Sequence, residues 1–378
     1  MSRKKKFLIF FATTAAIALL FRNGNLNRAK IVNMGTGNAF PCGRHNPEVR
    51  FDRIPHCKGT GHVSGSYAHF SYNALGLRDR DYPPKAPPGF TRILMLDGSV
   101  MVGSGLEENL SPVRQLENEL HKKGWKNVEV INGAVEGFTT VQNAIRLPKY
   151  IEAYNPDIII LYSIGNFKMF FDFVMGQYLD RSAPTPQKKN RLRLISPLAY
   201  LPDFLKIENA EFMSATYTIH DLYQRMKATF NLMLLDPDQQ ENSIMEVTME
   251  MLETMRDRAF LSNARFFVLW DGLESSSDIY LQSHHKEYLF RFFRFLFPRF
   301  TVSAKNVEET LREKGIEVIS IADEYRKIQD DHYHLERDHH WNALGSLEFA
   351  KMSAEKIVRL RAKQNGQLGL PPFEKIRH

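Results

Sequence analysis

The chain has 378 residues, of which 43% are hydrophobic and 25% charged, so it can bury a substantial core as one large domain or two ordinary ones. This composition is typical of a folded globular protein and argues against a fibrous or largely disordered one. The formal net charge is +7, and the basic residues are scattered and belong to no nucleic-acid recognition module, which argues against nucleic-acid binding. A basic surface near an anionic membrane explains the same charge just as well.

The N-terminus predicts export. A basic stretch, residues 1–6, precedes the apolar run Phe7–Phe21, and Arg22 follows it, which is the pattern of an export signal. As a helix the run would span about 22 Å, short of a hydrocarbon core of roughly 30 Å, and flanking lysines can snorkel to cover part of the difference. We predict an uncleaved anchor over residues 1–22, with the body on the periplasmic or extracellular side. The alternative is a signal peptide cleaved after Ala18.

Residues 23–88 contain many Gly, Pro and Asn residues and few periodic stretches, so we expect an irregular segment that wraps or links the body. This segment holds Cys42 and Cys57, the two cysteines of the chain. In an oxidising compartment a disulfide between them is the expected state. Two cysteines without neighbouring ligands at zinc spacing make a poor metal site.

From Arg92 onward, short apolar runs alternate with amphipathic helical patterns. The predicted strands are residues 92–96, 128–132, 157–162, 265–270 and 316–321. The predicted helices are residues 112–123, 140–153, 242–259, 307–314 and 344–360. Ser111 is the expected N-cap of the first helix, and Pro148 is expected to kink or end the second. Continuous apolar strands alternating with helices predict a parallel sheet covered on both faces.

Two segments interrupt this alternation. Residues from about 173 to 240 are interpreted as a helical insertion near the site that could act as a lid. Residues 284–300 interleave arginines with phenylalanines, which fits contact with a membrane surface, although an ordinary buried helix explains the pattern better. With this insertion, the predicted α/β domain spans residues 89–363, and residues 364–378 form a C-terminal tail.

Polar residues fall where the predicted strands end, the edge at which open parallel sheets form their sites. Serine acyl transfer needs a nucleophile, a base and a group that orients the base, together with donors for the developing oxyanion. Ser99 can be the nucleophile, His340 the base and Asp338 the orienting acid. The backbone N–H groups of Ser99 and Gly137, with the Asn166 side-chain amide, can form the oxyanion hole.

These residues, in this order, resemble the SGNH (GDSL-like) hydrolases. The resemblance runs from about Tyr72 to Leu360 and includes the upstream stretch "YNALGLRDRDYP" and the Trp-Asn that follows His340. It implies a three-layer α/β/α, flavodoxin-like fold with a mostly parallel sheet of five strands. It also implies esterase, deacetylase or O-acyltransferase chemistry on an acylated small molecule or cell-surface polysaccharide, without a metal or other cofactor.

Two departures from the family's motifs leave alternatives open. The family usually has Gly-Asp-Ser where this chain has Asp97-Gly98-Ser99, so Asp97 takes the glycine's place, where a positive φ would cost energy. This exchange favours the alternative of a catalytically inactive SGNH-fold envelope protein with a binding or structural role. The acid and the base are also closer together in the sequence than is common, which makes His339 a second candidate for the base.

The late histidines raise a different hypothesis, a metal site. A His-x-His pair near an Asp-His pair can bind zinc, and the residues concerned are His332, His334, Asp338 and His339. They fall on one late loop, with three residues between His334 and Asp338. We therefore predict that no metal is bound, and loss of activity with a chelator would contradict this.

Overall fold

The computed structural model describes residues 42–46, 48–63, 66–162, 165–178, 235–272, 304–328, 331–335 and 340–364. At its centre lies a five-stranded parallel sheet in the order β6-β5-β7-β8-β9. The strands are β5 (Thr91–Leu96), β6 (Val128–Asn132), β7 (Ile158–Tyr162), β8 (Arg265–Trp270) and β9 (Glu317–Ser320). Within the sheet this is the 2-1-3-4-5 order of flavodoxin-like folds.

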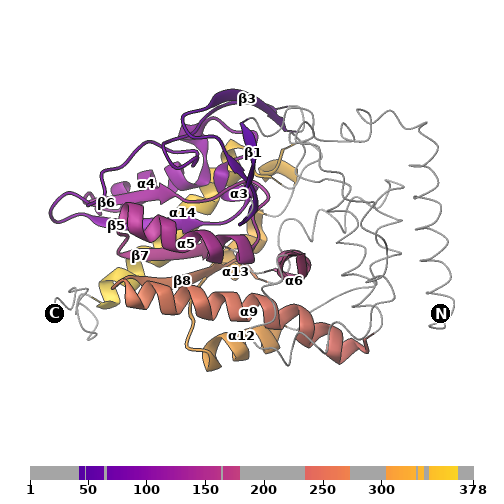
Figure 1. The fold of residues 1–378 in the computed structure, drawn as a ribbon. Helices are drawn as coiled ribbons and strands as arrows, with labels where there is room; N and C mark the ends of the chain where they lie inside the picture. Colours follow the sequence, from indigo (N-terminus) through magenta and orange to yellow (C-terminus); the bar gives the residue numbers. More distant parts are fainter. Residues whose placement is uncertain are drawn as a thin grey trace, which may run out of the picture.

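Helices cover both faces of the sheet, which confirms the three-layer α/β/α architecture (Figure 1). One face packs against α4 (Pro112–Lys122) and α14 (Ala343–Gln364). The other face packs against α5 (Thr140–Tyr154), α9 (Pro237–Leu261) and α12 (Ala304–Glu313), and α6 (Asn166–Tyr178) lies beside α5 and α9. Shorter helical turns are α3 (Ser99–Val102), α13 (Ala322–Tyr325) and the 3-10 turns η1 (Glu108–Leu110), η5 (Arg326–Ile328) and η6 (Asp331–Tyr333).

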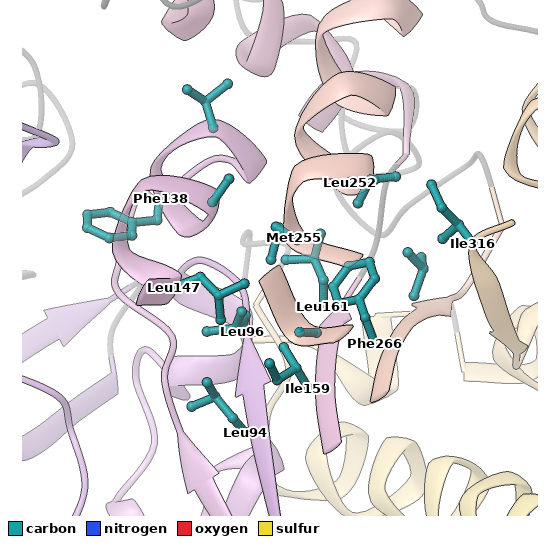
Figure 2. Close-up of a cluster of buried hydrophobic side chains, with 14 of the residues drawn as sticks. Leu94, Leu96, Phe138, Leu147, Ile159, Leu161, Leu252, Met255, Phe266 and Ile316 are labelled. Atoms are coloured by element: carbon teal, nitrogen blue, oxygen red, sulfur yellow. The ribbon is translucent and has the colours of Figure 1, made fainter. Parts of the chain in front are cut away.

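Burial on both faces explains why the central strands are continuously apolar. In β5, Ile93 and Met95 belong to the core under α4 and α14, whereas Leu94 and Leu96 belong to the core under α5 and α9. Figure 2 shows Leu94 and Leu96 with Leu252 of α9 in this second cluster. Because successive side chains of a strand point to opposite faces, a strand covered on both faces needs apolar residues at every position.

The helix that contains Pro148 does not end there. Pro148 lies inside α5, and the helix continues to Tyr154 before Asn155 closes it with a left-handed φ of 44°. The predicted helix over residues 140–153 is therefore confirmed, and of the two effects expected of Pro148 the structure excludes an end of the helix at that point, while a kink stays a prediction. Leu147 and Tyr150 are buried beside it, so packing holds the helix together beyond the point where the proline removes a hydrogen bond.

Part of the segment expected to be irregular forms two β-hairpins instead. The hairpins pair β1 (Gly43–Asn46) with β2 (Arg50–Arg53) and β3 (Lys58–Val63) with β4 (Ser66–Ser71). A disulfide joins Cys42 to Cys57, with 5.9 Å between their Cα atoms. Val49 packs into the core under α5, and Phe70 packs into the opposite core. These hairpins therefore belong to the same folded unit as the sheet. The folded unit begins on the N-terminal side of residue 89, the predicted start of the α/β domain.

Several expectations concern residues outside the described ranges. These are the anchor at residues 1–22, most of the insertion, the segment 284–300 and the tail after residue 364. Among the helices that the structure describes, none combines the length and the apolar character needed to cross a bilayer.

Candidate active site

Ser99 lies at the carboxyl edge of the sheet, directly after β5. The strand ends at Leu96, and a turn through Gly98 leads into α3, whose first residue is Ser99. A Cβ atom on Gly98 would lie 3.0 Å from the Phe138 carbonyl oxygen. Because Gly98 has no side chain, the loop between β6 and α5 can approach the turn that carries Ser99 closely.

The strand order reverses at β5, with β6 on one side and β7 on the other. The chain leaves β5 toward α4 on one face of the sheet and leaves β7 toward α6 on the opposite side. Ligands of open α/β sheets bind at the carboxyl ends of the strands where the order switches in this way. Ser99 occupies that point.

His340 provides the strongest geometric support for a reactive serine. Its Nε2 atom lies 2.7 Å from Ser99 Oγ, although 241 positions separate the two residues in the sequence. The His340 side chain is buried, and its backbone oxygen accepts a hydrogen bond of 2.8 Å from the Leu335 N–H. An isolated antiparallel bridge between His334 and Trp341 holds the same loop. The histidine is therefore fixed at hydrogen-bonding distance from the hydroxyl.

The other expected site residues are placed only in part. Gly137 adopts a left-handed φ of 78° in a turn closed by the Phe138 N–H and the Val135 carbonyl oxygen. The Cβ position of Gly98 lies 3.9 Å from the Gly137 nitrogen, so this N–H lies beside the nucleophile turn. Asn166 is the first residue of α6, and its side chain lies outside the described part of the chain. The same holds for both Asp338 and His339.

The Asp97-Gly98 exchange causes no backbone strain, because Asp97 does not adopt a positive φ. Its buried carboxylate instead accepts a hydrogen bond of 2.5 Å from Lys168 Nζ in the first turn of α6. The same ammonium group donates to the Tyr162 carbonyl oxygen at 2.8 Å. Sequence reasoning missed this lysine, because nothing in its spacing connects a residue of α6 with an aspartate that follows β5.

A buried ion pair supports the turn that carries Gly137. The Glu136 carboxylate, in a buried side chain, accepts hydrogen bonds from Arg53 Nε at 2.9 Å and from the Tyr72 hydroxyl at 3.2 Å. Burial lowers the pKa of Arg53, but attraction to Glu136 and Tyr72 and the hydrogen bonds with them together offset this, so the guanidinium pKa is raised overall. Arg53 lies in β2 and Tyr72 directly follows β4, so the hairpin region braces the turn that carries Gly137.

Arg78 braces the chain that follows Ser99. Its guanidinium group donates four hydrogen bonds to carbonyl oxygens, those of His69, Val102, Gly103 and Leu106. Its charge also lies 3.9 Å from the centre of the Phe70 ring. The upstream stretch that resembles the SGNH family contains Arg78 and was the signal in the sequence that could have identified it.

The alternative metal site gains no support from the part of the chain that is described. Within those residues, no group of three or more His, Cys, Asp or Glu side chains is arranged to hold a metal ion. Two residues of that hypothesis, Asp338 and His339, lie outside them.

Known proteins resemble this chain only in some solved structures of low sequence identity. No family model and no curated protein matches this sequence. The crystal structure of TesA is 11% identical, with a TM-score of 0.38 over 71% of this chain and 99% of its own. The esterase EstA from Pseudoalteromonas sp. is 10% identical, with a TM-score of 0.37 over 71% of this chain and 98% of its own. A catalytic mutant of Axe2, an acetylxylan esterase from Geobacillus stearothermophilus, is 10% identical, with a TM-score of 0.36 over 71% of this chain and 94% of its own. Similarity at this level of identity and TM-score does not establish a function for this chain.

Proposed function

We propose that this protein is a serine ester hydrolase or O-acyltransferase of the SGNH type. The observation that carries the proposal is the 2.7 Å contact between His340 Nε2 and Ser99 Oγ at the carboxyl edge of a parallel sheet. A serine hydroxyl becomes an effective nucleophile when an adjacent base accepts its proton. The proximity of the Gly137 N–H to the nucleophile turn adds a donor for the oxyanion.

The reaction follows the logic of a serine triad. Ser99 Oγ attacks the ester carbonyl carbon while its proton passes to His340 Nε2, and Asp338 orients the imidazole. The N–H groups of Ser99 and Gly137 and the Asn166 side chain stabilise the negative oxygen of the tetrahedral intermediate. Collapse of the intermediate breaks the ester C–O bond, and His340 returns the proton to the departing alcohol.

The acceptor in the second half of the reaction decides the activity. Water would release the acid and make the protein an esterase or deacetylase, whereas a sugar hydroxyl would take the acyl group and make it an O-acyltransferase. We propose an acetylated cell-surface polysaccharide as substrate, because the N-terminal pattern favours export. The disulfide between Cys42 and Cys57 supports the same location, since structural disulfides persist in oxidising compartments.

The location is testable with cells that express the full chain. We expect the protein in the membrane fraction after an alkaline carbonate wash, with both cysteines resistant to alkylation until a reductant is added. Release into the medium would indicate the cleaved signal peptide. Recovery in the cytoplasmic supernatant with two alkylated cysteines would contradict export.

The reactive serine is tested by labelling the full chain, in detergent, with a fluorophosphonate and locating the adduct by mass spectrometry. We expect an adduct on Ser99 that is lost in Ser99→Ala and His340→Ala, with hydrolysis of p-nitrophenyl acetate and acetylated glycans falling by about 10⁶-fold in each variant. Ser104→Ala is a matched control, because the Ser104 hydroxyl is buried with no hydrogen-bond partner among the described residues and should be dispensable. No adduct on folded protein would overturn the proposal and favour the inactive binding protein.

A further inference from the structure

The ion pair between Lys168 and Asp97 joins the two elements from which the proposed site is built. Asp97 lies two positions before Ser99, and Lys168 lies two positions after Asn166 in α6. The Lys168 ammonium also donates to the carbonyl oxygen of Tyr162, the last residue of β7. A single side chain therefore connects the end of β5, the end of β7 and the first turn of α6.

A lysine at this position would destabilise the fold without its two partners, the Asp97 carboxylate and the Tyr162 carbonyl oxygen. The N-terminal turn of a helix favours negative charge, because its free N–H groups and the helix dipole are positive there. The Lys168 side chain is 15% exposed and that of Asp97 is 7% exposed, so both charges are largely removed from water. Buried ion pairs of this kind contribute little net stability compared with apolar residues. Stability alone therefore gives a weak reason for the pair.

We propose that Lys168 is a positioning residue that sets the distance between the nucleophile and the oxyanion-hole asparagine. Through Asp97 it holds the start of α6, and with it Asn166, against the turn that presents Ser99. This inference rests on the proposed function. It also gives the exchanged Asp97-Gly98 pair a role, because the aspartate at position 97 reaches Lys168, whereas the backbone of Phe138 crowds the space beside position 98.

The test is a comparison of Lys168→Met with the double variant Asp97→Asn/Lys168→Met. We expect kcat for p-nitrophenyl acetate to fall by about 10- to 100-fold in Lys168→Met with little change in KM, because a displacement of 1 Å in a catalytic group can cost about 10²-fold. The double variant removes both charges and should recover thermal stability while kcat stays low. Recovery of kcat together with stability in the double variant would overturn the proposal and assign the pair a purely structural role.

Two further variants complete the design. Lys168→Arg keeps a cation that can reach Asp97, and we expect it to retain more activity than Lys168→Met. Lys351→Met removes a lysine from an exposed ion pair with Glu348 and is the matched control that should leave kcat unchanged. Wild-type activity in Lys168→Met would refute the positioning role alone. Absence of activity and labelling in the wild-type protein would instead refute the proposed function.

Discussion

The buried pair of Arg53 and Glu136 allows a quantitative prediction about stability. Their side chains are 5% and 1% exposed, and the Arg53 Nε to Glu136 Oε2 distance is 2.9 Å. Arg53→Met would leave the carboxylate inside the protein with the Tyr72 hydroxyl as its remaining donor from this cluster. Breaking a buried ion pair by removing one partner typically costs about 3–5 kcal/mol.

This cost corresponds to a measurable change in thermal unfolding. For a large domain, a loss of 1 kcal/mol in the free energy of unfolding lowers Tm by about 2–4 °C, and the smaller shift suits a chain of this length. We therefore expect Tm to fall by about 6–10 °C in Arg53→Met. Circular dichroism or scanning calorimetry at fixed pH and ionic strength would measure the shift.

A double-mutant cycle shows whether the charge is responsible. Arg53→Met/Glu136→Gln removes both charges and keeps an acceptor for Tyr72, so it should be more stable than Arg53→Met alone. The expected coupling energy is about 2 kcal/mol, within the range for contacting residues. Strictly additive effects of the two substitutions would refute the reasoning, because they would mean that the carboxylate does not depend on Arg53.

Two other predictions concern pH and the nucleophile turn. Burial raises the pKa of Asp172, although the Thr140 N–H and the Thr248 hydroxyl donate to it. Its protonated form therefore stabilises the fold below the unfolded pKa of about 3.9, and this contribution is lost as pH rises through the higher folded pKa. Urea unfolding between pH 4 and 7 should show Asp172→Asn gaining stability relative to the wild-type protein as pH rises, and parallel curves would contradict this. Gly98→Ala should lower kcat by about tenfold, because the new Cβ would press on the loop that carries Gly137, the proposed oxyanion donor. Loss of such a donor typically costs about 10²–10³ in kcat. Unchanged ester hydrolysis would contradict this, because it would show that the loop moves without loss of activity.

The sequence allows the sheet and the place of Ser99 directly after its first strand to be predicted, because both depend on local pattern. A strand covered on both faces is mostly apolar, so "VEVIN" and "RFFVLW" mark β6 and β8 at the observed boundaries. The Ser111 cap and the proline after it mark the start of α4 for the same local reason.

Features that depend on contacts between distant segments could not be predicted in this way. Nothing near Lys168 indicates that its partner lies at the end of β5, and nothing near Arg53 points to a carboxylate 83 positions later. The hairpins escaped prediction because their strands are short and rich in polar residues. The helix predicted over residues 140–153 continues past Pro148, because buried neighbours outweigh the loss of one backbone hydrogen bond.

The separation of 241 positions between Ser99 and His340 has a consequence for the order in which activity appears. The sheet edge with Ser99 and Gly137 comes from the first half of the described chain, whereas the base precedes α14, the last described helix. A chain that has folded its early strands but has not docked α14 against α4 therefore holds an ordinary serine hydroxyl. With the proposed activity, reactivity toward esters would be gained only in the final stage of folding, so a chain that lacks the docked His340 would not react with esters.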